Sequence, residues 1–366
     1  MKVIISNNSI VPYRTHFFNV FFNKYKKELD ESMVLYLTEN ESIRDWKNDT
    51  KTNFKYKVLP RIYQRRDRKT TTADKIINYG FLKYLKNADI FYSLGYSYPT
   101  YLIMAFFCKM KGIKTACFCE TNITDKSRYW FISKVKYILL NSLYDQFFVP
   151  GVNAKKYLLD LGISTCKIAT IGNSAPFLFE NSQMKMTDIQ EKKYDFNLLY
   201  VGRLSEEKNI INALKNLEYV DPIINITIVG SGPLVGEINK LVSLSKHNYI
   251  IKNNIEREQL PFIYKQNDIL LLPSLSEPWG LVVNEAISFG LGLLLSDRVG
   301  CAPDLVDGNG YIYDVHDNVD FINKFNLLYN DKEAYKKASL LLQEKISSDV
   351  NSTLLYNALR KLYETY

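Results

Sequence analysis

The stretch that decides the fold is residues 268–286, which read DILLLPSLSEPWGLVVNEA. Its first part, residues 268–274, is strongly apolar and predicts a buried strand. Pro278 and Gly280 then indicate a turn, and a helix-compatible run begins near Leu281. A strand followed by a tight turn and a helix start directs backbone N–H groups toward an anion. The pattern therefore predicts an anion-binding turn, and the alternative is an ordinary connection between a strand and a helix.

A carboxylate lies on each side of this turn. Glu277 is in the loop, where it could reach neutral hydroxyls. Glu285 lies about one turn inside the expected helix, where it could accept hydrogen bonds from a diol. Phosphate held by backbone N–H groups and hydroxyls held by carboxylates together indicate a sugar nucleotide as the ligand. The alternative is that both acids are ordinary surface residues.

A second phosphate-binding pattern follows the strand expected at residues 196–201. Gly202 would let the backbone approach a ligand closely. Arg203 and Lys208 lie five residues apart across a turn. The planar guanidinium of the first and the ammonium of the second could therefore bind the same diphosphate. Taken alone, such a pair is most often a solvated loop charge. Together with the two glutamates downstream it is much more specific.

A strand, a glycine turn and a helix are also expected around Gly230 and Gly232. A lone Gly-x-Gly is weak evidence and invites a dinucleotide interpretation. That interpretation requires an acid near the end of the next strand to hold a ribose diol. The next strand, residues 248–252, ends instead in Lys252 and Asn253. We therefore expect the two glycines to give a nucleotide or phosphate close access, without forming a dinucleotide fingerprint.

As an ordered set, these segments resemble the retaining glycosyltransferases of family 4, the glycosyl transferases group 1. The resemblance covers residues 197–314, about a third of the chain, and residues 148–173 match more weakly. It rests on VGRLSEEK at 201–208, VGSGP at 229–233, LPS at 272–274 and the glutamates at 277 and 285. It implies the GT-B architecture, in which two Rossmann-like, doubly wound α/β domains face a cleft and the last helix crosses back to the first domain.

The alternation of strands and helices separately predicts α/β domains with parallel sheets covered on both faces. Strands are expected at residues 3–6, 33–38, 56–59, 90–93, 114–119 and 146–149, with helices at 17–27 and 72–86 among others. With the roles that the resemblance implies, we expect an acceptor-binding domain at residues 1–180, a linker at 181–193, a nucleotide-sugar-binding domain at 194–345 and the returning helix at 346–366.

The resemblance also implies roles for the motif residues. Arg203 and Lys208 would neutralise the donor diphosphate, which is the leaving group, and Glu277 would hold hydroxyls of the transferred sugar. The sugar would pass to an acceptor hydroxyl with retention at the anomeric carbon, and no protein carboxylate need act as the nucleophile. The donor-binding set would be Gly202, Gly230, Gly232, Asn254, Ile255, Gly280, Leu281, Val282 and Glu285, with Asn254 and Ile255 flanking the base and Glu285 holding the ribose diol.

The first half departs from the family pattern in two places. The stretch at residues 6–14 has no glycine, where many members have a Gly-Gly loop. It does contain Pro12-Tyr13-Arg14, as some relatives do, so we expect Arg14 to face the cleft. Where many members have a histidine, this chain has Glu120, which could contact the donor sugar or the acceptor. The alternative for Glu120 is an acid at a helix start.

Charge is unevenly distributed along the chain. Residues 1–180 carry 28 Lys and Arg against 15 Asp and Glu, and the remainder carries 19 against 24. The densest cluster contains Arg61, Arg65, Arg66 and Arg68, with aromatic residues near it in sequence. Such a cluster could dock on an anionic bilayer or hold a lipid-linked diphosphate acceptor. A solvated basic face is the alternative. With the resemblance, we expect a membrane-bound or glycan acceptor, a place on the inner leaflet, and no nucleic acid partner.

Composition argues against a disulfide-bonded, metal-dependent or membrane-spanning protein. The five cysteines form no Cys-x-x-Cys pair and no Asp-x-Asp occurs, so we expect reduced thiols, a cytoplasmic location, no catalytic metal and no cofactor besides the donor substrate. The apolar run at residues 101–108 ends at Lys109, and we expect it to be a buried helix because it is too short for a membrane span.

The sequence thus favours a glycosyltransferase for a bacterial-type surface glycan. A sugar epimerase or phosphorylase could share the fold. A nucleotide-dependent oxidoreductase is disfavoured by the missing ribose acid after Gly232. A catalytically silent binding module is disfavoured because Arg203, Lys208, Glu277 and Glu285 are all present.

Overall fold

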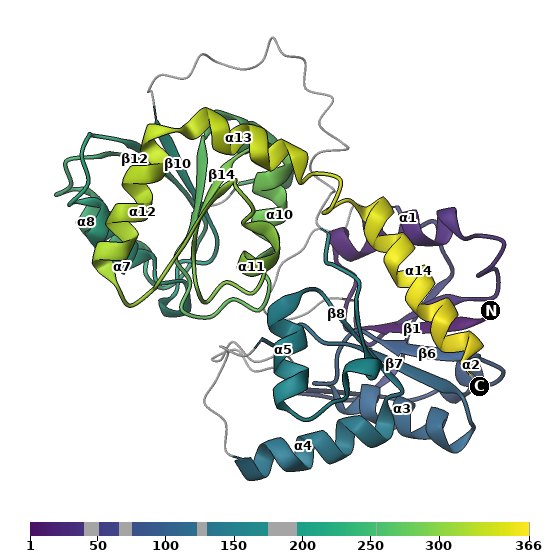
Figure 1. The fold of residues 1–366 in the computed structure, drawn as a ribbon. Coiled ribbons are helices and arrows are strands. Elements are labelled where there is room, and N and C mark those ends of the chain that lie inside the picture. Colours follow the sequence, from purple (N-terminus) through teal and green to yellow (C-terminus); the bar gives the residue numbers. More distant parts are fainter. Residues whose placement is uncertain (40–50, 66–74, 123–129, 175–195, 254, 366) are drawn as a thin grey trace. The chain divides into compact units, whose positions relative to one another are not determined.

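The computed structural model describes residues 1–39, 51–65, 75–122, 130–174, 196–253 and 255–365. The chain divides into two compact units (Figure 1). The first comprises Met1–Thr121, Lys126–Ser174 and Ser348–Tyr366, and the second comprises Asn122–Asp125 and Ala175–Ser347. The linker expected at residues 181–193 lies outside the described residues, and the domain limits expected from the sequence stay predictions.

The first unit is built around a parallel sheet with the strand order β3-β2-β1-β6-β7-β8-β9. Its elements are β1 (Val3–Asn7), α1 (Pro12–Lys24), β2 (Met33–Tyr36), β3 (Tyr56–Val58), β4 (Arg61–Arg65), β5 (Lys75–Asn78), α2 (Leu82–Leu85), β6 (Ile90–Ser93), α3 (Pro99–Met110), β7 (Lys114–Phe118), α4 (Trp130–Leu143), β8 (Gln146–Val149), α5 (Val152–Asp160), η1 (Thr165–Lys167), β9 (Ile168–Thr170) and α14 (Ser348–Glu364). The central strands β1, β6 and β7 are mostly buried and apolar, as a sheet covered on both faces requires.

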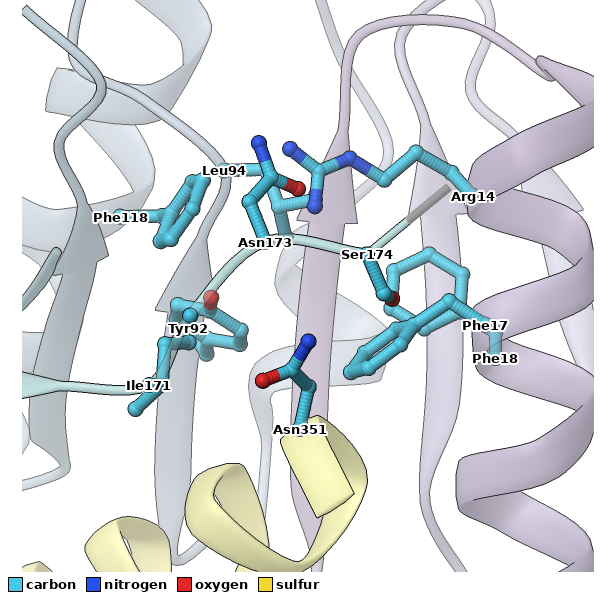
Figure 2. A pocket seen from close by; sticks show the side chains of 11 residues that line it. Arg14, Phe17, Phe18, Tyr92, Leu94, Phe118, Ile171, Asn173, Ser174 and Asn351 are labelled. Atoms are coloured by element: carbon cyan, nitrogen blue, oxygen red, sulfur yellow. The ribbon is translucent and has the colours of Figure 1, made fainter. Parts of the chain in front are cut away.

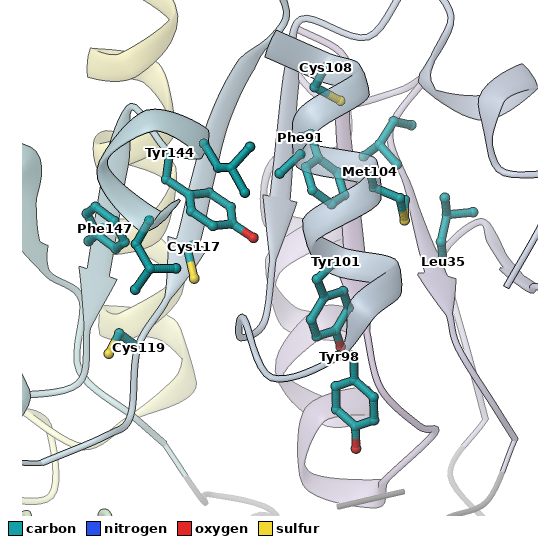
Figure 3. Close-up of a cluster of buried hydrophobic side chains, with 14 of the residues drawn as sticks. Leu35, Phe91, Tyr98, Tyr101, Met104, Cys108, Cys117, Cys119, Tyr144 and Phe147 are labelled. Atoms are coloured by element: carbon teal, nitrogen blue, oxygen red, sulfur yellow. The ribbon is translucent and has the colours of Figure 1, made fainter. Parts of the chain in front are cut away.

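Helices α1 and α14 cover one face of this sheet, and α3, α4 and α5 cover the other. The second of these cores is the cluster drawn in Figure 3. Leu355, Leu359 and Leu362 of α14 are buried with the phenylalanines of α1. The Tyr25 and Tyr356 rings stack with centroids 3.9 Å apart. The expectation that the last helix returns to the first domain is therefore confirmed.

The helix expected at residues 72–86 is wrong for most of its described part. Residues Lys75–Asn78 form β5, which pairs antiparallel with β4, and only Leu82–Leu85 is helical. Ile76 and Ile77 are β-branched, and β4 offers them a partner strand, so strand pairing prevails over the helical spacing of the apolar residues.

Helix α3 is only half buried, contrary to the expectation for residues 101–108. Tyr101, Met104 and Cys108 are buried, but Ile103 and Phe106 are exposed. The run is apolar on both sides of the helix, so its composition does not reveal which side lacks a cover. Among the described residues, no helix is long and apolar enough to cross a membrane.

The second unit holds a six-stranded parallel sheet with the order β12-β11-β10-β13-β14-β15. Its elements are β10 (Asn197–Val201), η3 (Glu206–Lys208), α7 (Ile210–Leu217), β11 (Asn225–Val229), α8 (Val235–Val242), β12 (Asn248–Lys252), η4 (Arg257–Gln259), α9 (Leu260–Gln266), β13 (Ile269–Leu272), α10 (Leu281–Ser288), β14 (Gly292–Ser296), α11 (Ala302–Leu305), β15 (Gly310–Tyr313), α12 (Asn318–Asn330) and α13 (Lys332–Leu341). Helices α7, α8 and α12 cover one face, and α9, α10 and α11 cover the other.

Both sheets share one topology. In each unit the first strand lies between the second and fourth strands of that sheet, so the direction of strand addition reverses beside β1 and beside β10. This is the doubly wound Rossmann arrangement, in which ligands bind at the carboxyl edge next to the reversal. The α/β fold with two Rossmann-like parallel sheets is thus as the sequence predicts.

Candidate active site

The candidate site of the second unit lies where the loops after β10 and β13 leave the sheet. The two strands are parallel neighbours, with Leu198 opposite Ile269. Because carboxyl ends of parallel strands share one edge, the loop containing Lys208 and the loop containing Glu277 emerge together. Their strands flank the point where the strand order reverses, which is the usual ligand position in this topology.

Lys208 and Glu277 form an ion pair across these loops, between Nζ and Oε2. Both side chains are mostly shielded, at 18% and 16% exposed. A backbone hydrogen bond from Leu275 N to Glu207 O, 2.9 Å long, joins the same two loops. The structure thus brings together two predicted catalytic residues that are 69 positions apart, and it places a cation and a carboxylate in direct contact.

Arg203 lies in the loop between β10 and η3. Its backbone carbonyl accepts a 2.7 Å hydrogen bond from the hydroxyl of Tyr200, which anchors the turn. The pKa of Glu207 is lowered: burial alone would raise it, but hydrogen bonds and the charges of Lys208 and Arg203 outweigh that effect. The positive charge of Arg203 is therefore felt within the same group of loops as the Lys208–Glu277 pair.

The glycines of the loop after β11 have a structural reason that the sequence did not reveal. Gly230 has φ +149°, and a Cβ there would overlap the carbonyl oxygen of Gly202. A Cβ on Gly232 would overlap the carbonyl oxygen of Leu204. The loops after β10 and β11 therefore touch backbone to backbone, and this contact alone accounts for both glycines. Their expected part in ligand access stays a prediction.

Helix α10 begins where the sequence predicts. Gly280 is its N-cap residue, with φ +98°, a conformation that disfavours other residues. Leu281 and Val282 occupy the first two helical positions, whose N–H groups have no acceptor within a helix. They follow Glu277 by one short turn, so the helix N-terminus and the ion pair belong to one connection. This arrangement suits an anion next to a cation.

Glu285 lies inside α10 and accepts a 2.7 Å hydrogen bond from the hydroxyl of Tyr264 on α9. Tyr264 also stacks on Phe289, with ring centroids 5.3 Å apart. The pKa of Tyr264 is raised well above its usual value, first by burial and then by the Glu285 carboxylate, so the hydroxyl remains a donor. Sequence reasoning missed Tyr264, because no local pattern ties a helical tyrosine to a glutamate 21 residues later.

Two further donor-site predictions fall after β12. Ile255 packs partly buried against the core that contains Leu272 and Val283. Asn254 lies outside the described residues. A pocket in this region is lined by Lys252, Glu258, Gln259, Phe262 and Ile263. Whether Ile255 flanks a base stays a prediction.

The first unit has a polar cluster of its own at the carboxyl edge of its sheet. Arg14 of α1 donates from Nη2 to Glu120 Oε1 over 2.8 Å. Asn173, which follows β9, donates to the same oxygen over 3.0 Å. The structure thus joins the two residues whose roles the sequence left open, and adds Asn173, which sequence reasoning missed. Glu120 is in contact with Arg14 and lies ten residues before α4 begins at Trp130.

Arg14 is enclosed by aromatic rings. Its guanidinium carbon lies 5.1 Å from the centroid of the Phe118 ring and 5.4 Å from that of Tyr13. Its side chain is 14% exposed, whereas that of Glu120 is 40% exposed. Burial alone would lower the pKa of Arg14, but the Glu120 carboxylate together with Tyr13 and Tyr92 outweighs it and the pKa is raised. In this pair the Glu120 carboxylate is partly exposed to solvent, while the Arg14 guanidinium is shielded and held in place.

The last helix contributes to this cluster. Figure 2 shows Asn351 of α14 in the pocket that Arg14, Phe118 and Asn173 also line. A Cβ on Gly172 would overlap the Asn351 Oδ1 atom, so the glycine makes room for the amide. Asn351 therefore packs against the loop that carries Asn173.

The basic cluster expected at Arg61, Arg65, Arg66 and Arg68 is described only in part. Arg61 begins β4 and donates to Thr38 Oγ1 over 3.1 Å and to the Gln64 side chain. Arg65 ends β4, and Arg66 and Arg68 lie outside the described residues. The use of this cluster as a membrane or acceptor surface stays a prediction.

Comparison with known proteins adds to this geometry. Residues 182–339 match the family model described as Glycosyl transferases group 1. Sulfoquinovosyl transferase SQD2 of Arabidopsis thaliana is 29% identical over 141 residues, which are 37% of this chain and 27% of that protein. A UDP-Gal:alpha-D-GlcNAc-diphosphoundecaprenol alpha-1,3-galactosyltransferase of Escherichia coli is 28% identical over 195 residues, which are 47% and 48% of the two chains. The chain thus spans less than half the length of either relative.

Solved structures resemble the whole chain. The crystal structure of Anabaena HepE in complex with UDP superposes with a TM-score of 0.73 and 13% identity, covering 99% of this chain and 100% of that chain. The apo form of the lipopolysaccharide outer core galactosyltransferase WaaB gives a TM-score of 0.68 and 16% identity, covering 99% of each chain. At these identities the likeness concerns the fold. Residues 182–339 of this chain are thus similar to the glycosyl transferases group 1 family, and its two Rossmann-like units have the GT-B fold of these solved structures.

Proposed function

We propose that this protein is a retaining glycosyltransferase that moves a sugar from a nucleoside-diphosphate sugar to a hydroxyl of a glycan or lipid-linked acceptor. The observation that carries this proposal is the Lys208–Glu277 pair at the strand-order reversal of the second sheet, one turn before the N-terminus of α10. A cation, a carboxylate and free helix N–H groups together suit a ligand that combines phosphate with hydroxyls.

In this proposal the second unit binds the donor. Lys208 and Arg203 compensate the negative charge of the diphosphate, and the N–H groups of Leu281 and Val282 add the helix N-terminus. Glu277 accepts hydrogen bonds from hydroxyls of the transferred sugar. Glu285 accepts from the ribose diol, while Tyr264 holds the Glu285 carboxylate in position through its 2.7 Å hydrogen bond.

The contact between Lys208 and Glu277 has a consequence for donor binding. Without a ligand, each charge compensates the other at a site where both side chains are less than a fifth exposed. A donor that brings phosphate to Lys208 and hydroxyls to Glu277 replaces that pairing with two separate sets of contacts. A nucleoside diphosphate without its sugar offers only the first set, so the full donor should bind differently from the free nucleotide.

The proposed reaction breaks the bond between the anomeric carbon and the donor phosphate oxygen, and forms a bond to the acceptor oxygen on the same face. The proton of the acceptor hydroxyl passes to an oxygen of the departing diphosphate. The chain's residues stabilise the leaving-group charge and position the sugar, so no protein nucleophile and no bound metal are required in this proposal.

The first unit is proposed to bind the acceptor. Arg14 is fixed by Glu120 and two aromatic rings, and it can present a permanent positive charge to a phosphate or hydroxyl group. Glu120 keeps 40% of its side chain exposed, so it can still accept a hydrogen bond from an acceptor hydroxyl. These roles for Arg14 and Glu120 are part of the proposal.

The printed names of similar proteins support the choice of substrates. Anabaena HepE was crystallised with UDP and with UDP-glucose. The Escherichia coli relative is named for transfer from UDP-Gal to a diphosphoundecaprenol-linked sugar. A relative from Klebsiella pneumoniae, 26% identical over 250 residues, is described as a protein in the cps region. For this chain we propose a UDP-sugar donor and a role in surface polysaccharide synthesis at the cytoplasmic face of a membrane.

The first experiment is a thermal-shift panel on the purified chain with UDP, GDP, ADP, dTDP, CMP, NAD and matching nucleotide sugars, without added metal. We expect selective stabilisation by one nucleoside diphosphate and its sugars, with transfer then assayed for that donor. Because β12 ends in Lys252, which cannot accept hydrogen bonds from a ribose diol, NAD should have no effect. Stabilisation by NAD alone would favour an oxidoreductase, and no stabilisation at all would overturn the donor site.

A further inference from the structure

Helix α4 carries an apolar stripe on its exposed side. Phe131, Val135, Ile138 and Leu139 follow the spacing i, i+4, i+7 and i+8, which places them on one face of a helix. In most helices of globular proteins this face is buried, but here Phe131 is 63% and Ile138 58% exposed. The buried face of α4 is the opposite one, which includes Leu140.

Helix α3 extends the same exposed surface. It packs against α4, and both helices cover the same face of the first sheet. Figure 3 shows Tyr101, Met104 and Cys108 on the side of α3 that faces the core. Ile103, Phe106 and Met110 lie on the exposed side, at 45%, 55% and 62%. We name the exposed apolar residues of the two helices the α3–α4 face.

The charged residues within α3 and α4 have one sign, although Lys109 of α3 is paired with Asp145 just after α4. Neither helix contains an Asp or Glu, although acids make up 39 of the chain's 366 residues. Exposed Lys134 lies on one border of the α4 stripe, and half-buried Lys136 lies on the other, with its ammonium 4.6 Å from the centroid of the Tyr96 ring. Exposed Lys111 follows α3 directly. Exposed Trp130 begins α4, with the Lys134 ammonium 5.9 Å from its ring centroid.

These features favour a lipid surface over another protein. The cores of protein interfaces are depleted in lysine, whereas helices that lie in the membrane interface carry lysines beside an apolar stripe. Tryptophan is also enriched at the level of the lipid headgroups. Because α4 has 14 residues, it is shorter than the ~20 needed to span a bilayer. A helix of this kind lies along the surface.

We infer that the α3–α4 face docks the protein on an anionic lipid bilayer, with the apolar stripe among the headgroups and the exposed Lys111 and Lys134 next to lipid phosphates. This inference deepens the proposed function, because a lipid-linked acceptor is found at a membrane. It also differs from the expectation for the basic cluster on β4, whose described member Arg61 is bonded to Thr38 and Gln64. Its physical basis and its test do not depend on sugar transfer.

The test is co-sedimentation of the full chain with two kinds of vesicle. One contains phosphatidylcholine alone, and the other contains phosphatidylcholine with about 30 mol% phosphatidylglycerol. The test variant is Phe131→Glu combined with Ile138→Glu. Both side chains are exposed, so their replacement should not disturb the packing of the core. The matched control is Tyr219→Glu combined with Leu244→Glu, which replaces two exposed apolar residues of the second unit. A separate Lys134→Glu variant tests the charge.

We expect the wild type to bind the anionic vesicles more tightly than the neutral ones, with the control unchanged. The Phe131→Glu, Ile138→Glu variant should bind about tenfold or more weakly, and Lys134→Glu should lose a few-fold, in a salt-dependent way. All variants should keep the nucleotide thermal shift of the wild type. That readout separates the two proposals, since a lost nucleotide shift with retained vesicle binding would count only against the donor site.

Three outcomes would overturn the inference. The wild type could fail to bind any vesicle. The double variant could bind as well as the wild type, which would move docking to another surface, such as the one tested by Arg61→Glu. Finally, the wild type could form a dimer without lipid that the double variant abolishes, with no vesicle binding by either, which would make the α3–α4 face a contact between two copies.

Discussion

The two units of this protein agree at one edge of their sheets and differ at the other. At the amino edge, Asp89 precedes β6 and accepts a 2.7 Å hydrogen bond from the N–H of Lys2, just before β1. In the second unit, Asp268 precedes β13 and accepts a 2.9 Å bond from the N–H of Asn197, at the start of β10. The same link therefore joins the first and fourth strands of each sheet.

At the carboxyl edge the two units have different chemistry. The second unit pairs a lysine with a glutamate, and both are shielded. The first unit pairs Arg14 with a half-exposed Glu120 and adds Asn173 and aromatic rings. A lysine can leave its partner for a phosphate, whereas a guanidinium held on several sides is fixed in place. The two units thus share the links that hold their sheets together at the amino edge, and they differ at the carboxyl edge, where the residues of the proposed function lie.

The largest effect is expected when the shielded cation of the second unit is removed. Lys208→Ala should lower the rate of sugar transfer about 10²–10³-fold, because it removes a charge next to the leaving group. The thermal shift with UDP should fall with it. Exposed Lys215 on α7 provides the control, since Lys215→Ala should leave both readouts unchanged. Full activity in Lys208→Ala and in Glu277→Gln would show that the site assignment is wrong.

A second test concerns the backbone contact between the loops after β10 and β11 of the second unit. Gly230→Ala should lower stability by about 3 kcal/mol or more, because its Cβ overlaps the Gly202 carbonyl and its φ is +149°. Gly236 in α8 has open space around it, so Gly236→Ala should instead stabilise by ~0.5–1 kcal/mol. Thermal unfolding monitored by circular dichroism measures both. Equal melting temperatures for the two variants would contradict the loop packing.

A third prediction separates the roles of the two polar clusters. Arg14→Lys keeps the positive charge but loses the planar guanidinium that binds Glu120, so the rate of sugar transfer should fall about tenfold. The change should appear mainly in the KM of the acceptor, with the donor's thermal shift retained. Arg360→Lys, at an exposed arginine of α14 that is paired with Glu364, is the matched control. An effect of Arg14→Lys on donor binding alone would assign this cluster to the donor.

The smallest expected effect is a pH dependence in the first unit. Burial alone would raise the pKa of Asp145, but hydrogen bonds from Lys109 and Thr115 outweigh it and the pKa is lowered. Because the folded pKa lies below the unfolded value of about 3.9, the stabilisation is present above that pH and is lost as pH falls through the folded pKa.

Asp145→Asn should therefore cost about 1 kcal/mol at neutral pH and little near pH 3, as measured by urea unfolding at the two pH values. Exposed Asp160, at the end of α5, is the control, and Asp160→Asn should have a small effect at both pH values. A penalty for Asp145→Asn that is equally large at low pH would point to packing and not to charge.

Local patterns were sufficient to predict much of the fold. The strand at residues 248–252 has the predicted bounds, and α10 begins at Leu281 as the Pro278–Gly280 turn indicates. Apolar runs bounded by turn residues specify such elements without reference to the rest of the chain. The helix expected at residues 72–86 failed because the strand β5 depends on pairing with β4, which is a nonlocal contact.

The site was predictable as residue types, but not as contacts. Lys208 and Glu277 stand out by their motifs, but their ion pair follows only from the adjacency of β10 and β13. Tyr264 and Asn351 reach the two clusters from other helices and have no motif of their own. Such supporting residues are set by packing between elements far apart in sequence.

The return of α14 to the first unit also determines the order in which the protein can be completed during synthesis. Residues 348–366 emerge only after the whole second unit, Ala175–Ser347, has been translated. At ~5–20 residues per second, this leaves about 9–35 s in which the phenylalanines of α1 lack their final cover. The second unit can close on the ribosome, whereas the first unit, although made first, must wait for the last helix.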